Sequence, residues 1–449
     1  MKGVKNELAR DFNLRSLLRF ALPTVLMNLF VGCYYIVDGV CVARFVGTDA
    51  LSAMNITYPT FFTALAISIM LATGGSAIVA KKMGEGKDQE AREDFTALTL
   101  VTVLTGLLFS ALCIAFLRPL IYFLGADDAL FPMSRDYLFI QLCFTPAIFM
   151  QMFFQTFFVT AGRPKVGLIL SLIAGCTNIV LDLVLVGALG LGVQGASFAT
   201  CIGYSIPAVV GTVFFFGRGK VLYFTRPRLH RGVLSRSCTN GASEMIANLS
   251  TSITTAVFNI IMMRLVGQDG VAAITVLVYT QYLFQAFFTG FSVGVAPIFS
   301  YNYGSGDRAR LARLFRMSTR CVLAASVGVF LVMEAFTPVM VWIFADRASE
   351  VYRIATTGIR IYSVAYLCYG TNVFASSFFT ALSNGRISAL ISVLRTLVFL
   401  LSGVVVLSVL LGAMGVWMAG PFAEIATILF SLWFFRRNGA RYGYLPAKS

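Results

Sequence analysis

The stretch Val46-Gly47-Thr48-Asp49, followed by Ala53, returns 220 residues later as Val266-Gly267-Gln268-Asp269, followed by Ala273. Further glycine-containing matches follow in the same order, at offsets of 220 or 223: Gly84 and Gly86 with Gly304 and Gly306, Gly162-Arg163 with Gly385-Arg386, and Gly192-Val193 with Gly415-Val416. A series of matches in one order at a nearly fixed spacing indicates a chain built from two similar halves.

Both halves are strongly apolar. Of the 449 residues, 58% are hydrophobic and only 12% are charged, and the mean hydropathy is +0.82, which excludes a soluble globular domain and a disordered chain. Apolar runs of about 20 residues recur along the chain, each long enough to cross a bilayer as a helix. The predicted spans are 16–42, 50–80, 95–117, 133–160, 166–188, 195–216, 237–266, 272–300, 318–344, 355–382, 387–411 and 414–435.

Six spans per half is an even number, so both halves insert with the same orientation and form parallel repeats. We therefore expect an all-α integral membrane protein whose twelve transmembrane helices form two six-helix lobes that face a central cleft. The expected division is an N-lobe over 1–216, a basic connector over 217–236 and a C-lobe over 237–449.

The net charge of +15 follows from this topology. With both termini inside, 28 of the 35 Lys and Arg residues fall in cytoplasmic segments and 7 in outer ones, which is a strong positive-inside bias. The sequence thus predicts a multi-pass protein of the cytoplasmic (inner) membrane, with both termini cytoplasmic. The bilayer is its expected partner, and nucleic acid is not needed to explain the charge. Scattered cysteines and a single histidine predict no metal centre, cofactor or enzymatic site.

Five carboxylates lie inside long apolar stretches and cannot be assigned to a loop or a helix end: Asp38, Asp182, Glu244, Glu334 and Glu424. A charge at the bilayer centre costs about 2.5–3.5 kcal/mol, so such groups usually face a cavity, pair with a partner or carry a proton. The bases are expected at loops and helix ends. Arg395 fits this least well, because it lies inside its predicted helix and would have to snorkel.

The repeat separates two of these acids from the rest. Asp38 aligns with Phe258 and Asp182 with Val405, so both acids belong to the N-lobe alone. Asn178 lies four residues before Asp182, on the same helix face. Two carboxylates and a carboxamide at one depth could hold a proton or a sodium ion, with Thr200 as a further oxygen ligand. Protons are the favoured choice, and a buried network that only joins helices is the alternative.

Polar side chains at helical spacing also predict the wall of a substrate cavity. Glu244 ranks first, as an acid that could attract organic cations. The predicted cavity residues are Tyr34, Gln151, Gln155, Glu244, Asn248, Asn259, Gln281, Gln285 and Asn372. Stripes of this kind line either a cleft or a helix–helix contact. Glu334 and Glu424 have no predicted role.

Proline marks a candidate hinge. Pro23 lies in the same predicted helix as Asp38, and a proline inside a helix removes a backbone hydrogen bond and favours a kink. Protonation of Asp38 could thereby be coupled to bending of this helix.

Taken together, several motifs resemble those of the multidrug and toxic compound extrusion (MATE) family, over nearly the whole chain. They are Pro23 with Asp38, Val46-Gly47 with Ala50-Leu51 and Ala53, Ala161-Gly162-Arg163-Pro164, Asn178 with Asp182, Gly192-Val193 through Thr200, and Pro297-Ile298 through Gly304. The segment Gly241-Ala242-Ser243-Glu244 resembles the bacterial multidrug-exporter branch.

The resemblance implies an antiporter that exports cationic, mostly aromatic compounds in exchange for protons or sodium, by alternating access and as a monomer. It carries the cation-site role over to Asp38, Asn178, Asp182 and Thr200, with sodium possible at the first three. A lipid or lipid-linked oligosaccharide flippase of the wider superfamily is the main alternative. Such proteins often carry basic residues in the cavity, where this sequence predicts acids and amides. A membrane-embedded enzyme would need a nucleophile–base pair or a metal cluster near the interface, and the sequence predicts neither. A receptor or scaffold without transport leaves the five acids unexplained.

Overall fold

The computed structural model describes residues 6–46 and 48–445, apart from the side chains of residues 33–44, 48, 49, 51 and 252. The described chain is helical almost throughout. The N-lobe follows a short 3-10 turn, η1 (Glu7–Ala9), and consists of α1 (Leu14–Phe45), α2 (Thr48–Gly84), α3 (Asp88–Ala115), α4 (Leu117–Phe123), α5 (Phe131–Cys143), α6 (Thr145–Thr160), α7 (Pro164–Leu181), the π-helical η2 (Asp182–Ala188) and α8 (Gly192–Phe216).

The C-lobe repeats this order. It consists of α9 (Val233–Leu265), α10 (Gln268–Gly304), α11 (Arg308–Phe344), α12 (Glu350–Ser363), α13 (Tyr366–Ala381), α14 (Gly385–Val393), the π-helical η3 (Leu394–Leu400), α15 (Leu401–Leu411) and α16 (Ala413–Tyr442). In both lobes the fourth span is broken and the fifth contains a π-helical segment. The α5–α6 pair bends by 56°.

Each of the twelve predicted spans is occupied by one helix or by consecutive helices. Ten helical segments of the described chain are long and apolar enough to cross a membrane, and the bent α5–α6 pair adds an eleventh. The predicted span 355–382 is formed by α12 and α13, and the first of these carries the charged side chains of Arg353 and Arg360. The predicted fold class is therefore confirmed.

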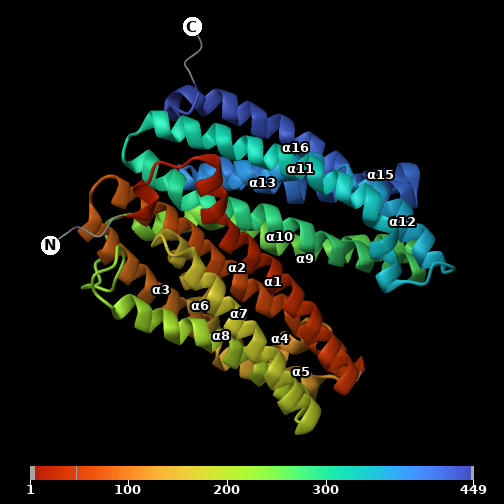
Figure 1. Ribbon diagram of the computed structural model, residues 1–449. Helices are drawn as coiled ribbons and strands as arrows, with labels where there is room; N and C mark the ends of the chain where they lie inside the picture. Colours follow the sequence, from red (N-terminus) through yellow and green to blue (C-terminus); the bar gives the residue numbers. More distant parts are fainter. Residues whose placement is uncertain (1–5, 47, 446–449) are drawn as a thin grey trace.

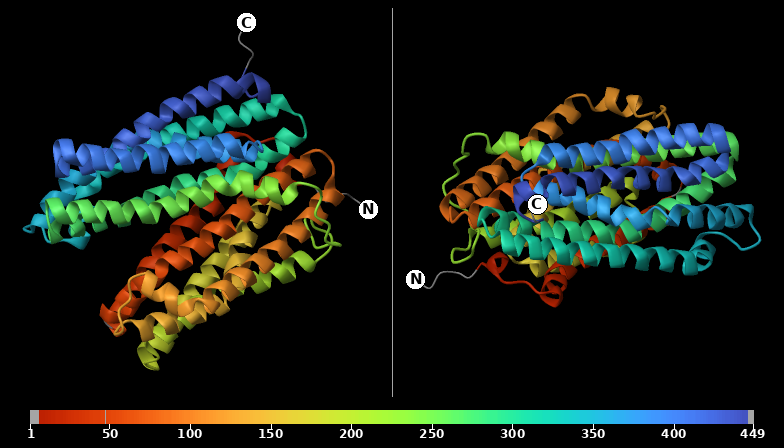
Figure 2. Two further views of the ribbon diagram at one scale, coloured as in Figure 1. Left: turned by 180° about the vertical axis from the view of Figure 1, so that it is seen from behind. Right: turned by 90° about the horizontal axis from the view of Figure 1, so that it is seen from above.

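The two lobes form a V (Figure 1). We call the end at which η1 and the last turn of α16 lie the terminal end, and the opposite end the open end. The lobes meet near the terminal end and diverge toward the open end, where α5 and α12 lie far apart in Figure 1 and in the reverse view of Figure 2. The inner sides of the V are formed by α1 and α2 of the N-lobe and by α9 and α10 of the C-lobe.

Glycines allow α2 and α9 to touch backbone to backbone. A Cβ atom built on Gly74 would lie 1.9 Å from the carbonyl oxygen of Ser237, and one built on Gly241 would lie 1.9 Å from the carbonyl oxygen of Met70. These separations are far below any van der Waals contact, so only glycine fits at either position. The lobes therefore close on the terminal side at a distance that a single methyl group would prevent.

The same contact recurs under the symmetry of the repeat. A Cβ atom on Gly84 would lie 2.0 Å from the carbonyl oxygen of Tyr301, and one on Gly304 would lie 2.0 Å from the carbonyl oxygen of Lys81. Gly84 and Gly304 differ by 220 residues, as do Lys81 and Tyr301. The lobe interface thus follows the two-fold relation that the sequence repeat predicts.

The connector between α8 and α9 lies against the N-lobe. Arg92 of α3 donates from Nε to the carbonyl oxygen of Val221 at 3.0 Å, and Asp94 Oδ1 lies 3.1 Å from the backbone nitrogen of His230 and 2.8 Å from its Nδ1. Asp94 is fully buried and also binds Lys82 Nζ at 2.5 Å. The C-lobe helix α9 begins at Val233, four residues before the predicted boundary, and the division into lobes stays a prediction.

Candidate functional site

The N-lobe holds a buried polar cluster where α7 passes into η2. Asp182 is the first residue of the π-helical segment and is fully buried, while Asn178 and Thr200 are 2% and 8% exposed. Asn178 Nδ2 lies 3.4 Å from Thr200 Oγ1, so α7 and α8 are joined by a long hydrogen bond. π-helical segments inside α-helices are frequent at functional sites, because the extra residue redirects side chains and backbone carbonyls.

A cavity of ≈ 10 Å³ lies beside this cluster. Its wall is formed by Val31, Gln151, Ser171, Ala174, Gly175, Asn178, Thr200, Gly203 and Tyr204. The predicted cavity residue Gln151 therefore lies beside Asn178 and Thr200, which were predicted for the cation site. Gln155 donates to Ser171 Oγ at 3.0 Å, and Ser171 lines the same cavity. Asn178 Oδ1 is buried and accepts no hydrogen bond from the described residues. A carboxamide oxygen in this position suits a cation.

Asp38, Tyr34 and Pro23 were all predicted on the first helix. The structure places them in α1, which packs beside α7 and η2, the elements that carry Asn178 and Asp182. The side chains of Asp38 and Tyr34 lie outside the described residues, so their share in the site stays a prediction. Pro23 lies within α1, nearer to the terminal end of this helix.

Glu244 lies where the two lobes meet. It is partly buried and lines a cavity of ≈ 20 Å³ together with Thr73, Ser76 and Thr156 of the N-lobe and Ser377 of the C-lobe. The wall is completed by Ala77, Val293, Ala296, Ser300, Thr380 and Ala381.

Asn248 and Asn259 follow Glu244 along α9. Asn248 donates from Nδ2 to the backbone carbonyl of Glu244 at 2.8 Å. Asn259 is partly buried, and its Oδ1 accepts no hydrogen bond from the described residues. Asn248 and Asn259 lie on the same helix as Glu244, but neither lines the cavity that Glu244 lines.

Gln281 and Gln285 line a separate cavity of ≈ 90 Å³ within the C-lobe. The two side chains are linked at 3.5 Å, and Tyr362, Tyr369 and Glu424 share the wall. The other lining residues are Thr251, Thr254, Thr255, Phe258, Ile274, Leu277, Val278, Arg395, Thr396 and Leu400.

The charges around this cavity differ from those expected from the sequence, because one of the lining residues is a base, Arg395. Arg395 does not snorkel to a helix end: it lies in η3, in the middle of a membrane-spanning segment. Its Nε lies 3.9 Å from Glu424 Oε1, and its guanidinium group lies 5.1 Å from the ring centre of Tyr369. The expectation that only acids occupy the interior is therefore wrong, because Arg395 is a base at the depth of Glu424.

Glu424 belongs to a hydrogen-bonded network behind this cavity. Asn372 Nδ2 donates to Glu424 Oε2 at 2.7 Å and to the Glu424 carbonyl at 2.9 Å, and Ser431 Oγ donates to Asn372 Oδ1 at 2.8 Å. Asn372 is fully buried and holds Glu424 rather than forming the cavity wall. Glu334, the other unassigned acid, accepts a hydrogen bond from Ser363 Oγ at 2.6 Å.

Arg395 and Glu424, the charged pair of the C-lobe, have no charged counterparts in the N-lobe, just as Asp38 and Asp182 have none in the C-lobe. At an offset of 223, Arg395 corresponds to Leu172 and Glu424 to Cys201. The sequence does contain a signal of this buried ion pair: an arginine stands within an apolar run, Val393-Leu394-Arg395-Thr396-Leu397. An arginine inside a membrane span needs a partner at the same depth. That its partner is Glu424 follows only from the packing of η3 on α16.

Comparisons with known proteins agree with this architecture. The family model described as MatE matches residues 23–184 and 245–425, one match in each repeat. Multidrug export protein MepA of Staphylococcus haemolyticus is 22% identical over 294 residues, 65% of each chain, so the match spans just under two thirds of that relative. The FAD transporter of Shewanella oneidensis is 21% identical over 418 residues, 92% of each chain.

Among solved structures, the outward-facing conformation of a multidrug resistance MATE family transporter of the MOP superfamily superimposes with a TM-score of 0.91 at 19% identity, covering 99% of both chains. That likeness establishes the fold, and the two family matches cover more than half of the chain. The chain thus belongs to the MatE family and is a multi-pass membrane transporter, not an enzyme.

Proposed function

We propose that this transporter exports small organic cations, mostly aromatic, in exchange for protons or sodium ions. The observation that carries the proposal is the buried cluster of Asp182, Asn178 and Thr200 in the N-lobe. An ionisable group in an apolar lobe is costly unless it serves a function, and oxygen ligands at one depth suit a proton or a sodium ion. Protons are the favoured coupling ion, because a single carboxylate suffices to carry one.

Orientation follows from charge. The terminal end carries Lys81, Lys82 and Lys87 together with the basic connector, so the positive-inside rule makes this end cytoplasmic. The V then opens outward, and the glycine contacts of α2 with α9 close the cytoplasmic side. Alternating access requires this contact to separate while the open end closes. Each chain contains both lobes, so we expect a monomer to suffice, in the cytoplasmic membrane.

Transport into liposomes tests the proposal. Purified protein is reconstituted, and movement of the aromatic cation ethidium is followed by fluorescence under a proton gradient and, separately, under a sodium gradient. Transport under one gradient identifies the coupling ion. Asp182→Asn should abolish gradient-driven transport, whereas Asp128→Asn, a change at an exposed acid in a loop, should leave it intact. If ethidium moves under neither gradient, or if Asp182→Asn transports normally, the proposal is wrong.

A second substrate class has its own support. Arg395 lines the C-lobe cavity, where a guanidinium group can bind a carboxylate or a phosphate. The relative from Shewanella oneidensis is named an FAD transporter, and the flippase alternative also calls for a base in the cavity. Export of an anionic or zwitterionic aromatic compound is therefore the runner-up. Transport of FAD that is lost in Arg395→Gln, with ethidium transport retained, would favour it.

A further inference from the structure

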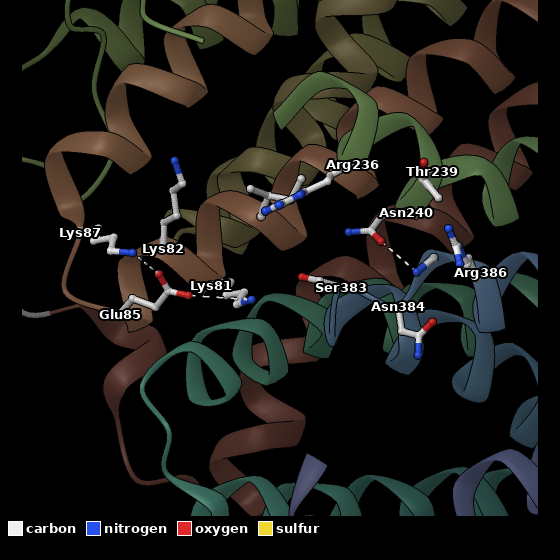
Figure 3. A pocket seen from close by; sticks show the side chains of 12 residues that line it. Lys81, Lys82, Glu85, Lys87, Arg236, Thr239, Asn240, Ser383, Asn384 and Arg386 are labelled. Atoms are coloured by element: carbon white, nitrogen blue, oxygen red, sulfur yellow. Dashed lines mark hydrogen bonds and ion pairs between the residues drawn. The ribbon is translucent and has the colours of Figure 1, made fainter. Parts of the chain in front are cut away.

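A basic pocket lies between the lobes at the terminal end. It encloses ≈ 500 Å³ and is shown in Figure 3, with the α2 residues on one side, Arg386 on the other and Arg236 between them in this view. The lining residues are Ile78, Lys81, Lys82, Glu85 and Lys87 of α2 and the turn that follows it, Arg236, Thr239 and Asn240 of α9, and Ser383, Asn384, Gly385 and Arg386 at the start of α14. Five bases from both lobes thus surround one acid.

The bases differ in how their charge is compensated. Lys82 binds buried Asp94 and also Glu90, so its charge is neutralised away from the pocket. Lys81 and Lys87 share Glu85, at 3.8 and 3.0 Å.

The two arginines have no such compensation. Arg236 and Arg386 are exposed, and none of the ion pairs found among the described residues includes either of them. Two guanidinium groups without an ion pair among the described residues therefore face one pocket.

The equivalent turn of the N-lobe is covered by the chain itself. Gly162-Arg163 corresponds to Gly385-Arg386, and η1 packs there so closely that a Cβ atom on Gly162 would lie 2.9 Å from Glu7 Cβ. The segment that precedes the C-lobe cannot do the same, because the connector is hydrogen-bonded to α3 of the N-lobe. The turn at Gly385 lines the pocket instead and packs on α9: Gly385 is buried, and its backbone N–H donates to Asn240 Oδ1 at 2.9 Å.

We propose that this pocket binds a phosphate-bearing anion, held by Arg236 and Arg386 with Lys81 and Lys87 across the lobe interface. Arginine binds phosphate through paired, charge-assisted hydrogen bonds, and basic pockets between helices on the cytoplasmic side of a membrane protein suit anionic lipid headgroups. The phosphate can belong to a lipid headgroup or to a soluble compound. Both kinds of ligand carry the phosphate group that the two arginines would bind.

Binding is linked to the conformation of the transporter, a step that rests on the proposed alternating access. The bases come from α2 on one lobe and from α9 and α14 on the other, so the pocket exists only while the cytoplasmic side is closed. Like charges repel across this interface, and an anion between them removes the repulsion. An anion at ten times its dissociation constant shifts the equilibrium toward the outward-open state by about 11-fold.

The experiment uses the full-length protein in neutral detergent and measures binding of three probes by calorimetry. They are dihexanoyl-phosphatidylglycerol, dihexanoyl-phosphatidylcholine and inorganic phosphate. The double variant Arg236→Gln/Arg386→Gln should weaken anion binding at least tenfold. The matched control, Arg163→Gln/Lys165→Gln, removes two charges at the equivalent N-lobe turn and should leave binding within twofold of the unmodified protein.

Binding of phosphatidylglycerol but not of inorganic phosphate assigns the pocket to a lipid headgroup, and binding of inorganic phosphate assigns it to soluble phosphates. The proposal is overturned if neither probe binds better than phosphatidylcholine, or if the control variant loses as much affinity as the pocket variant. Spin labels at Leu189, directly after η2, and at Leu410, in α15, should move apart when the anion binds, because these segments lie at the open end in Figure 1. Binding without this change overturns the conformational link. Asp182→Asn should still bind the anion, so failure of transport and failure of this site are distinguishable.

Discussion

Adding one methyl group at Gly74 should open the terminal end of the transporter, where the two lobes meet. In the structure, a Cβ atom at this position would lie 1.9 Å from the Ser237 carbonyl oxygen and 2.8 Å from the Gly241 backbone nitrogen. An ordinary carbon–oxygen contact needs about 3.3 Å, so α2 and α9 have to separate by more than 1 Å. Both neighbours are backbone atoms, and no side-chain rotation can relieve the overlap.

The magnitude follows from the cost of overpacking. Forcing a methyl group into a well-packed interface typically costs about 1–3 kcal/mol. The clash exists only while α2 and α9 are in contact, so the penalty falls on the state described here, in which the terminal end is closed, and spares a state in which α2 and α9 have separated. A penalty of about 2 kcal/mol changes the ratio of the two states about 30-fold, since every 1.4 kcal/mol is a factor of ten.

Pulsed electron paramagnetic resonance between spin labels at Leu189 and Leu410 measures the result. Gly74→Ala should move the population toward the shorter distance, at which the open ends of the lobes have approached each other. Gly84→Ala should act in the same direction, because its Cβ atom would lie 2.0 Å from the Tyr301 carbonyl oxygen. The control is Gly328→Ala in α11, where a Cβ atom would meet no heavy atom within 4 Å.

The reasoning is refuted if Gly74→Ala gives the same distance distribution as the unmodified protein and as Gly328→Ala. Loss of folding is a separate outcome, and thermal unfolding recognises it. A variant with a lower unfolding temperature but an unchanged distance between the spin labels would show that the methyl group disturbs the packing within a lobe and does not separate the two lobes.

Three further predictions concern other buried groups. Glu424→Gln or Arg395→Met alone leaves one charge of the pair unmatched and should destabilise the protein by about 3–5 kcal/mol, whereas the double variant should cost less than either; thermal unfolding of the purified variants measures this difference, and equal losses would contradict the pairing. Asp94→Asn removes the buried anion that holds Lys82 and His230, so we expect a lower unfolding temperature and faster hydrogen exchange over residues 217–232, neither of which should follow Asp128→Asn. Pro23→Ala should impair transport while expression stays unchanged, and normal ethidium transport would remove the hinge from the mechanism.

Much of the fold could be predicted because two of its properties can be read directly from the sequence: the lengths of the apolar runs and the spacing of the repeat. Apolar runs long enough to span a bilayer mark the helices, and the offset of 220 relates Gly84 to Gly304 without any knowledge of packing. The sequence could not show that these glycines touch the opposite lobe. That contact depends on which helix faces lie inside the V, which is a tertiary property.

The site was predictable only where its parts are close in sequence. Asn178 and Asp182 share a helix face because they are four residues apart, and the structure keeps them together at the α7–η2 junction. Asn372 illustrates the opposite case. Its spacing identified a polar face of α13, but a spacing cannot tell a cavity wall from a helix–helix contact. In the structure Asn372 binds Glu424, 52 residues away.

The position of Arg395 was wrongly predicted because most bases of a membrane protein lie at helix ends. Bases usually lie at helix ends, and long side chains can reach the interface from inside a helix, so snorkelling was the natural expectation. The structure instead supplies a carboxylate and an aromatic ring at the same depth. Partners that come from η3, α13 and α16 are brought together by folding alone, and no local pattern connects them.

The glycine contacts between the lobes also bear on how such a chain could arise. Gly84 meets Tyr301 and Gly304 meets Lys81, so each half presents to the other the same surface that it receives. This is the geometry of an isologous interface, in which residue i contacts j and j contacts i, and it is the rule for homodimers with two-fold symmetry. A six-helix ancestor that carried this surface could already have paired with its own copy in the membrane. In a chain that contains both halves, each half can change alone. Asp182 and Arg395 can therefore each occur in one half only, which is impossible when both halves are copies of one sequence.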